Sequence, residues 1–311
     1  MKTIVIYFSD KEPMGYPFNK GYYFDTYSQI IKDIENKGVD VFIVRADSYQ
    51  GSGIFKFGWS LQDGELKKSD GEIKADLIFN RDDKNTIPQI HDCKIINVPE
   101  LDNLCLDKWA TAQMFPEFSP ETDYVHSYEE CMSVIEKRNL KNEDRVVLKK
   151  NFQTEGRGVF VIKSNEITKD LYDDWSDVLA QGFLDSEIGI PEVVEGVHDL
   201  RINVVNGEII NAYVRTPKPG TFLANVAQGG KGLSLTNDQI SEEVIELVKK
   251  IQTKLKKFLP SVYSADFMNS SQGYKLIEMN SRPMVQSEKY FTDYKKFNSA
   301  LVDMLVEEVN K

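Results

Sequence analysis

Three oxygen-bearing side chains near the end of the chain have the spacing of a cation site. They lie on two predicted strands joined by a turn. If the loop is the three residues 271–273, with its glycine in the left-handed conformation, Asp266 lies directly opposite Glu278, with Cβ atoms roughly 5 Å apart. Asn280 is two residues beyond Glu278 and therefore points to the same side. Two carboxylates and an amide offer the hard oxygen donors that Mg²⁺ prefers, so the hairpin predicts a site for Mg²⁺ and a nucleotide.

A glycine-containing turn between two earlier strands could hold an anion. Gly156 and Gly158 would let the backbone approach phosphate oxygens closely, and successive N–H groups can cradle an anion. Lys149, at the end of the preceding strand, could reach a phosphate as a point charge. Taken alone, such a turn is more often simply structural. It matches neither the P-loop nor the dinucleotide fingerprint, both of which run from strand to helix.

Polar and apolar residues alternate strictly along the strand that begins at Asp199. Asp199, Arg201 and Asn203 therefore share one face, which is either a site or a solvated surface. Arg215 ends the next predicted strand. The glycine-rich loop 216–232 that follows is long enough to act as a lid, although such loops usually only connect elements.

Composition restricts the partners and the compartment. The 311 residues carry a formal net charge of −11, so broad electrostatic binding to nucleic acid or to an anionic membrane is not expected. The apolar run at the N-terminus is too short for export or a membrane span. Three cysteines without metal-binding spacing fit a reducing cytoplasm. We expect a cytoplasmic globular protein.

The elements that must position these residues change character along the chain. The first part alternates strands and a helix, which predicts an open parallel, Rossmann-like sheet of the α/β class. No glycine fingerprint follows its first strand, so this unit is expected to lend loops to a substrate site. The predicted elements are strands 3–8, 39–46, 76–80 and 94–98 and the helix 25–38.

The rest of the chain predicts an α+β arrangement. Helices are expected within 107–140, with Asp107 as an N-cap, and later at 238–258 and 288–310. In the final hairpin, Ile277 and Met279 would face the core. Strands are predicted at 145–150, 159–163, 178–184, 199–206 and 208–215. Changes in the pattern of predicted strands and helices suggest three domains, at 1–105, 106–185 and 186–311.

Taken in order, these segments resemble the ATP-grasp superfamily, and most of all glutathione synthetases and the RimK-like ligases that add glutamate to a ribosomal protein. The resemblance covers nearly the whole chain. It rests on residues 97–100 with 107–108, 147–149 with 156–158, 179–184, 199–201, Arg215 with Asn225 and 229–232, and 266 with 278–280.

The resemblance implies an ATP-grasp fold: a Rossmann-like N-terminal domain, a small central subdomain with the glycine loop, and a mixed α/β C-terminal subdomain with the metal site. ATP would lie between the last two. The implied nucleotide-binding residues are Lys108, Lys149, Gly156, Arg157, Gly158, Gln181, Gly182, Phe183, Leu184, Asp199 and Asn225. Asp266, Glu278 and Asn280 would hold two Mg²⁺, or Mn²⁺ in their place, with Glu278 bridging. Arg201 and Arg215 would be catalytic.

The reaction implied by the resemblance is amide formation. ATP would phosphorylate a carboxylate to an acylphosphate, and an amine would displace the phosphate, with Arg201 stabilising the oxyanion. The substrates would be an amino acid, a small peptide or a peptide terminus, read by the loops 9–24 and 80–85 and by Lys231 and Arg282. A small-molecule kinase and a non-catalytic nucleotide-binding regulator are the alternatives. Homo-oligomers are common in the superfamily.

Two departures from the family pattern leave questions open. Arg282 replaces a small residue in the segment after Asn280, and it could clamp a substrate carboxylate or pair with a local acid. The segment between Leu184 and Asp199 does not identify the ribose-binding acid, for which Glu187 and Glu192 are candidates.

Overall fold

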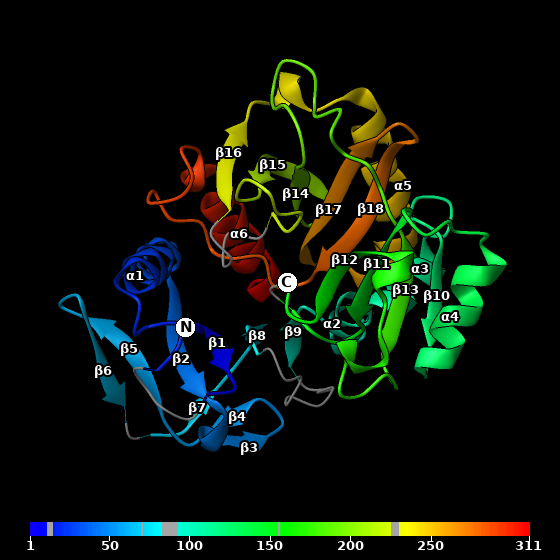
Figure 1. The fold of residues 1–311 in the computed structure, drawn as a ribbon. Coiled ribbons are helices and arrows are strands. Elements are labelled where there is room, and N and C mark those ends of the chain that lie inside the picture. Colours follow the sequence, from blue (N-terminus) through cyan, green and yellow to red (C-terminus); the bar gives the residue numbers. More distant parts are fainter. Residues whose placement is uncertain (11–14, 70, 83–92, 155, 225–229) are drawn as a thin grey trace.

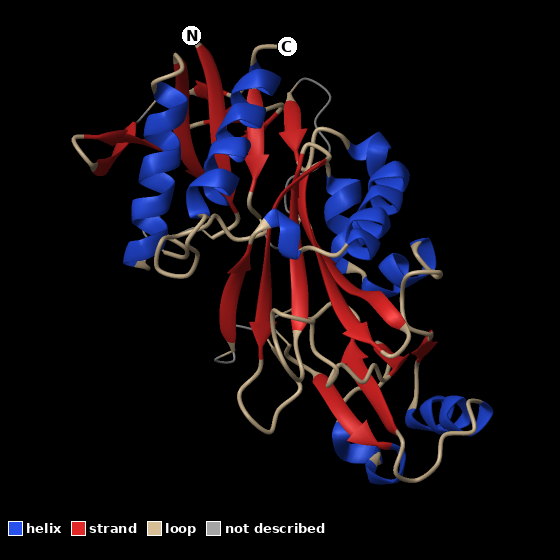
Figure 2. Cartoon of the chain, turned by 90° about the horizontal axis from the view of Figure 1, so that it is seen from above, coloured by secondary structure: helices blue, strands red, loops and turns tan. Residues whose placement is uncertain are grey.

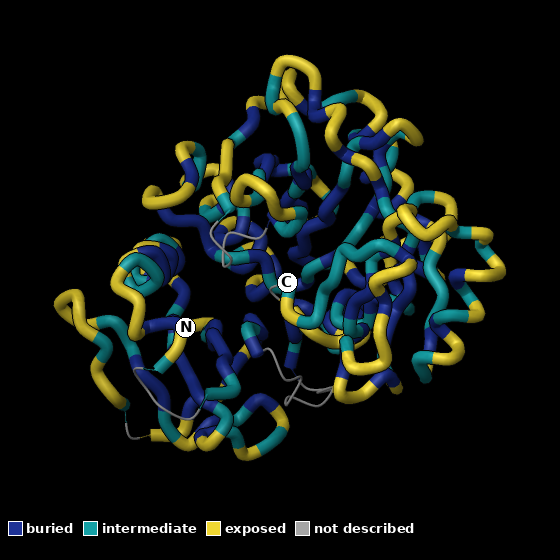
Figure 3. The backbone as a smooth tube through the Cα atoms, viewed as in Figure 1, coloured by how far each residue is buried: buried dark blue, intermediate teal, exposed yellow. Residues whose placement is uncertain are grey.

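The computed structural model describes residues 1–10, 15–69, 71–82, 93–154, 156–224 and 230–311. Within these ranges the strands form three large sheets and one small sheet (Figure 1). Figure 3 shows that the most deeply buried segments belong mainly to the strands and to the helix faces against them, whereas turns and loop tips are exposed.

The N-terminal sheet has the expected parallel centre. Strands β1 (Lys2–Phe8), β2 (Val39–Arg45), β8 (Leu77–Asn80) and β9 (Lys94–Ile96) are parallel, and they are apolar because both faces of the sheet are covered. The sequence interpretation missed an antiparallel extension, β5 (Gly58–Gln62) with β6 (Glu65–Ser69). It also missed the small sheet of β3 (Tyr49–Gly51), β4 (Ile54–Phe55) and β7 (Ile73–Lys74).

Two helices from opposite ends of the chain pack on this sheet. Helix α1 (Gly21–Glu35) buries Ile30, Ile31 and Ile34 against it. Helix α6 (Tyr294–Val309) lies beside α1 in Figure 2, and it also contacts strands of the C-terminal sheet. The last helix therefore joins the first and last parts of the chain through one hydrophobic core.

The central sheet is antiparallel, in the order β10-β13-β11-β12. Its strands are β10 (Thr122–Val125), β11 (Arg145–Lys150), β12 (Val159–Lys163) and β13 (Val178–Gly182). Helix α4 (Tyr128–Lys137) packs beside it, and the Ser127 side chain caps the helix by accepting a hydrogen bond from the Glu130 N–H.

The C-terminal sheet is antiparallel in the order β16-β15-β14-β17-β18. Its strands are β14 (Asp199–Val205), β15 (Glu208–Thr216), β16 (Lys231–Leu235), β17 (Val262–Ser270) and β18 (Gly273–Asn280). One face packs against α2 (Pro99–Leu106), α3 (Lys108–Met114) and α5 (Glu242–Leu255). The described residues contain no helix that is long and apolar enough to cross a bilayer.

The β17–β18 hairpin has the predicted pairing of Asp266 with Glu278, but its loop differs from the predicted one. Asp266 does lie opposite Glu278, but Ser270 pairs with Gly273, so the loop is one residue shorter than predicted. A bulge beside Asp266 supplies the missing residue, Ile277, and restores the register. Because Ile277 is the bulged residue, it lines a cavity instead of facing the core as predicted, whereas Met279 is buried as expected.

Candidate active site

Two cavities meet at the C-terminal sheet. The first cavity lies between this sheet and the central sheet, and the second lies between it and the N-terminal sheet. Lys108, Arg215 and Glu278 line both. A ligand in the first cavity can therefore meet a ligand in the second at these three charged side chains.

The inner part of the first cavity is apolar. Its apolar walls come from β11, β12, β17, β18 and the segment after β13, and they suit a flat ring system. The residues are Val147, Val159, Val161, Phe183, Leu184, Met268 and Ile277. Gly156, Gln181 and Gly182, which were predicted to bind nucleotide, line the same cavity. The side chain of Gln181 and the glycine backbone thus place polar groups beside the apolar walls, as in many small-molecule sites.

Lys149 lies at the boundary between the apolar and charged parts. Its side chain is buried, and Nζ donates to Gln181 Oε1 at 2.9 Å and to the Ile277 carbonyl at 3.3 Å. Burial lowers the pKa of Lys149 to about 8, while Glu278 opposes the shift and Lys108 adds to it.

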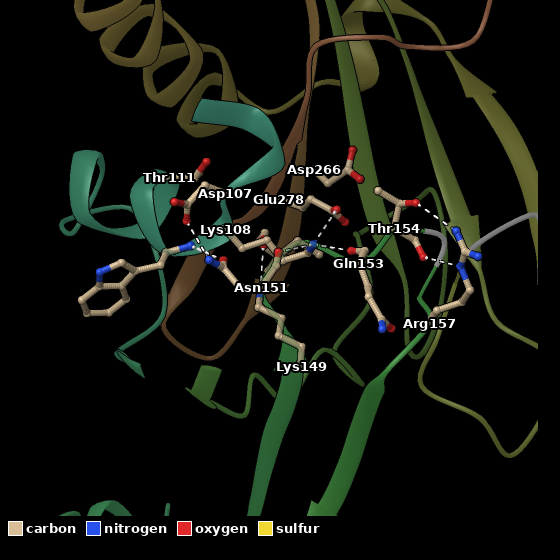
Figure 4. Close-up of polar contacts among 12 residues, drawn as sticks. Asp107, Lys108, Thr111, Lys149, Asn151, Gln153, Thr154, Arg157, Asp266 and Glu278 are labelled. Carbon is tan, nitrogen blue, oxygen red and sulfur yellow. Dashed lines mark hydrogen bonds and ion pairs between the residues drawn. The ribbon is translucent and has the colours of Figure 1, made fainter. Parts of the chain in front are cut away.

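Lys108 is held in place by the start of helix α3. Asp107 caps that helix by accepting from the Ala110 N–H at 2.9 Å, and it also accepts from Asn151. Lys108 Nζ donates to the backbone carbonyls of Asn151 and Gln153 and lies 3.8 Å from Glu278 Oε1 (Figure 4). The ammonium group is therefore fixed where the two cavities join.

Four charged side chains form a continuous chain of ion pairs across β15, β14 and β17. Arg215 donates to both oxygens of Asp199, at 2.6 and 2.8 Å, and to Asp266 at 2.7 Å. Arg201 binds Asp266 through two hydrogen bonds of 2.7 Å. Burial acts to raise the pKa of Asp266, but the two guanidinium groups outweigh it and hold this pKa below its usual value.

The predicted metal ligands are arranged as the sequence suggested. Asp266 and Glu278 are cross-strand neighbours, and Glu278, 35% exposed in its side chain, faces both cavities. Asn280 lines the second cavity, and its Oδ1 accepts from the Arg282 N–H at 2.8 Å. Among the described residues, no group of three or more His, Cys, Asp or Glu side chains could hold a metal alone. This oxygen set fits Mg²⁺, which usually binds one or two carboxylates together with substrate phosphates and water.

Some of the residues that were predicted to bind the nucleotide do not line either cavity. Arg157 is exposed and donates to Thr154, outside both cavity linings. Glu187 and Glu192, the ribose candidates, are also exposed and line neither cavity. Gly158, which was predicted to bind nucleotide, has a positive φ of +64° but does not line either cavity. Asn225 lies outside the described residues.

The second cavity contains both predicted substrate residues. Lys231 lines it from β16, and Arg282 lines it from the segment after β18. Arg282 Nη2 donates to Asp102 Oδ2 at 2.7 Å, so of the two roles left open for Arg282, pairing with a local acid is present.

The two N-terminal loops that were expected to contact the substrates, 9–24 and 80–85, both supply residues of this cavity, although the sequence did not single out the individual side chains. Arg81 follows β8 and lines the cavity, as do Tyr16, Tyr23 and Tyr27. Among the aromatic residues at positions 16–24, Phe18 is part of the core, whereas Tyr16 and Tyr23 line the cavity. The available signal for Arg81 was its position just beyond the carboxyl end of a parallel strand, where ligands bind in open α/β sheets.

Comparison with known proteins places this geometry in context. A family model described as a RimK-like ATP-grasp domain matches residues 107–300. The coenzyme gamma-F420-2:alpha-L-glutamate ligase of Methanocaldococcus jannaschii is 29% identical over 200 residues, which are 63% of this chain and 64% of that protein. The chain therefore spans less than two thirds of that relative's length.

Solved structures match over nearly the full chain. VanG D-Ala:D-Ser ligase of Enterococcus faecalis matches with a TM-score of 0.67 and 13% identity, covering 99% of both chains. ATP-grasp ligase PsnB, complexed with a phosphomimetic variant of its minimal precursor, Mg and ADP, matches with a TM-score of 0.60 and 12% identity, covering 99% of this chain and 98% of that one. At such identities these matches show the fold, and the predicted ATP-grasp fold is confirmed.

Proposed function

Because the chain belongs to the RimK-like ATP-grasp family, we propose that it is an ATP- and Mg²⁺-dependent ligase that joins a carboxylate to an amine. One observation carries this proposal: the two cavities share Lys108, Arg215 and Glu278. A nucleotide in the first cavity would bring its terminal phosphate to these side chains. A carboxylate in the second cavity would reach the same point from the other side.

The nucleotide would use the residues of the first cavity. Its base would fill the apolar slot beside Gln181 and Phe183, and its phosphates would extend toward Lys149 and Lys108. The two lysines supply positive charge that is already positioned by backbone carbonyls and by Gln181. Asp266, Glu278 and Asn280 would hold Mg²⁺, which would neutralise phosphate charge.

Amide formation would proceed in two steps. A carboxylate oxygen attacks the terminal phosphorus of ATP, which forms an acylphosphate and releases ADP. The amine nitrogen then attacks the acyl carbon, phosphate leaves, and the nitrogen loses a proton. Arg201 lines the second cavity and is held by Asp266, so it is positioned to stabilise the oxyanion of the tetrahedral intermediate.

The substrates we propose are amino acids or peptides. The named relatives support this class: one is a glutamate ligase, one joins D-Ala to D-Ser, and one is complexed with a precursor. The cytoplasm remains the expected compartment, since all three cysteines are free.

Release of ADP tests the proposal. The protein is mixed with ATP, Mg²⁺ and a panel of amino acids and dipeptides, and both ADP and amide products are measured. The proposal predicts ADP release that requires a carboxylate and an amine together. ADP binding without amide formation from any pair would contradict it, and a stable phosphorylated product formed without an amine would indicate a kinase.

A further inference from the structure

A buried carboxylate, Asp102, lies beside two guanidinium groups at the second cavity. Asp102, on α2, has 1% of its surface exposed. Its Oδ2 accepts from Arg282 Nη2 at 2.7 Å and from Asn80 Nδ2 at 3.1 Å. Burial raises the pKa of Asp102, and the positive charges of Arg282 and, to a smaller degree, Arg81 act against that rise.

The hydrogen-bond partners of Arg81 are neutral in the part of the chain that the structure describes. Its Nη2 donates to the Pro283 carbonyl at 2.9 Å and to the Arg282 carbonyl at 3.4 Å. Its Nε donates to the Tyr27 hydroxyl at 3.2 Å. These bonds attach Arg81 to the backbone that carries Arg282, so the two side chains are held together at the same wall of the cavity.

We propose that Arg81 and Arg282 form a binding site for a substrate carboxylate that does not react. This inference rests on the proposed function and deepens it. Two guanidinium groups line the same cavity, and guanidinium matches a carboxylate through paired hydrogen bonds. Both residues line the second cavity and neither lines the first. An amino acid used as the amine would present its α-carboxylate here.

Asp102 acts in this site as a positioning residue. It has 1% of its surface exposed at the edge of the cavity, it fixes Arg282 through a short ion pair, and it is itself fixed by Asn80. Substituting Asp102 by asparagine would remove the charge that holds Arg282. The expected effect is therefore weaker recognition of the carboxylate, with nucleotide binding unchanged.

Direct binding tests the site. Titration calorimetry in the presence of ADP and Mg²⁺ measures each amino acid of the panel as the free acid and as the α-carboxamide. The free acid is expected to bind about ten- to a hundred-fold more tightly, because the carboxamide lacks the negative charge that the two arginines would bind. Arg81→Gln and Arg282→Gln should abolish this preference. Asp102→Asn should reduce it and raise KM for the free acid without lowering kcat to the same extent.

ADP affinity shows whether each variant has kept its fold. Asp123→Asn is the matched control, because it breaks another buried arginine's ion pair, with Arg138, outside both cavities. It should leave the preference intact. Equal binding of acid and carboxamide, no binding of any free acid, or a preference that survives in both arginine variants would overturn the inference. ADP release is measured in parallel, and it tests the proposed ligase function independently of the carboxylate site.

Discussion

Lys149 combines burial with a position between the base and phosphate parts of the first cavity. A buried ammonium group with a pKa near 8 is partly neutral at physiological pH. The neutral amine would be a weaker phosphate ligand than the ammonium ion. Lys149 should therefore make nucleotide binding sensitive to pH in a range where phosphates no longer titrate.

We expect ADP affinity to fall as the pH rises through about 8, because the lysine loses its charge there. A decrease of about tenfold between pH 7 and pH 9.5 is the expected size for one titrating group. The measurement is ADP binding across this range, compared with Lys149→Met, which should bind weakly at every pH. A Lys149→Met variant with the same pH slope would contradict the assignment.

Glu278 is the predicted metal ligand that both cavities share. Replacing it with glutamine should remove the increase in ADP affinity that Mg²⁺ produces and should lower turnover by about a hundredfold or more. ADP binding without Mg²⁺ should change little. Glu117→Gln, at an exposed site outside both cavities, is the control. If Mg²⁺ still strengthens ADP binding to Glu278→Gln, another group holds the metal.

At the scale of elements, the β17–β18 hairpin shows what sequence alone could and could not predict. Alternation along the strands, together with an assumed three-residue loop, placed Asp266 beside Glu278. A three-residue loop, or a two-residue loop followed by a one-residue bulge at Ile277, gives the same pairing of Asp266 with Glu278. Alternation does not distinguish these two arrangements. The bulge matters because it turns Ile277 into the cavity, where its carbonyl accepts from Lys149.

Gly273 tests this turn. It has a φ of +79°, and a Cβ there would lie 2.7 Å from Glu243 Oε1, which accepts a hydrogen bond from the Tyr274 N–H. Gly273→Ala should cost about 1–2 kcal/mol in the free energy of unfolding, measured with urea. Gly71→Ala meets no atom within 4 Å and should change stability much less. Equal effects would show that the Gly273 conformation carries no special cost.

At the scale of the whole molecule, helix α6 connects parts of the chain that the sequence suggested were separate. It packs against β1 and β8 of the N-terminal sheet and against β14 and β15 of the C-terminal sheet (Figure 1). Its apolar spacing predicted a helix but not the surfaces it would cover. Contacts between residues so distant in sequence have no local signal, which also explains why the sequence allowed Arg282 to pair with an acid but did not identify that acid as Asp102.

Leu305 measures the contribution of this helix. It is fully buried in the core shared by α6 and the N-terminal sheet, so Leu305→Ala should lower the free energy of unfolding by about 2–5 kcal/mol. Asp303→Ala on the same helix removes only an exposed ion pair with Lys37 and should cost about 1 kcal/mol or less. Urea unfolding compares the two. A small loss for Leu305→Ala would mean that α6 contributes little to the shared core.

The central claim is that a carboxylate in the second cavity receives phosphate from ATP in the first. Oxygen transfer tests it most directly. When the carboxylate substrate is labelled with ¹⁸O on both oxygens, the account predicts that each inorganic phosphate released carries one ¹⁸O atom, since the acylphosphate bridge oxygen leaves with phosphorus. Mass spectrometry of the phosphate gives the answer. Unlabelled phosphate accompanying amide formation would contradict the account.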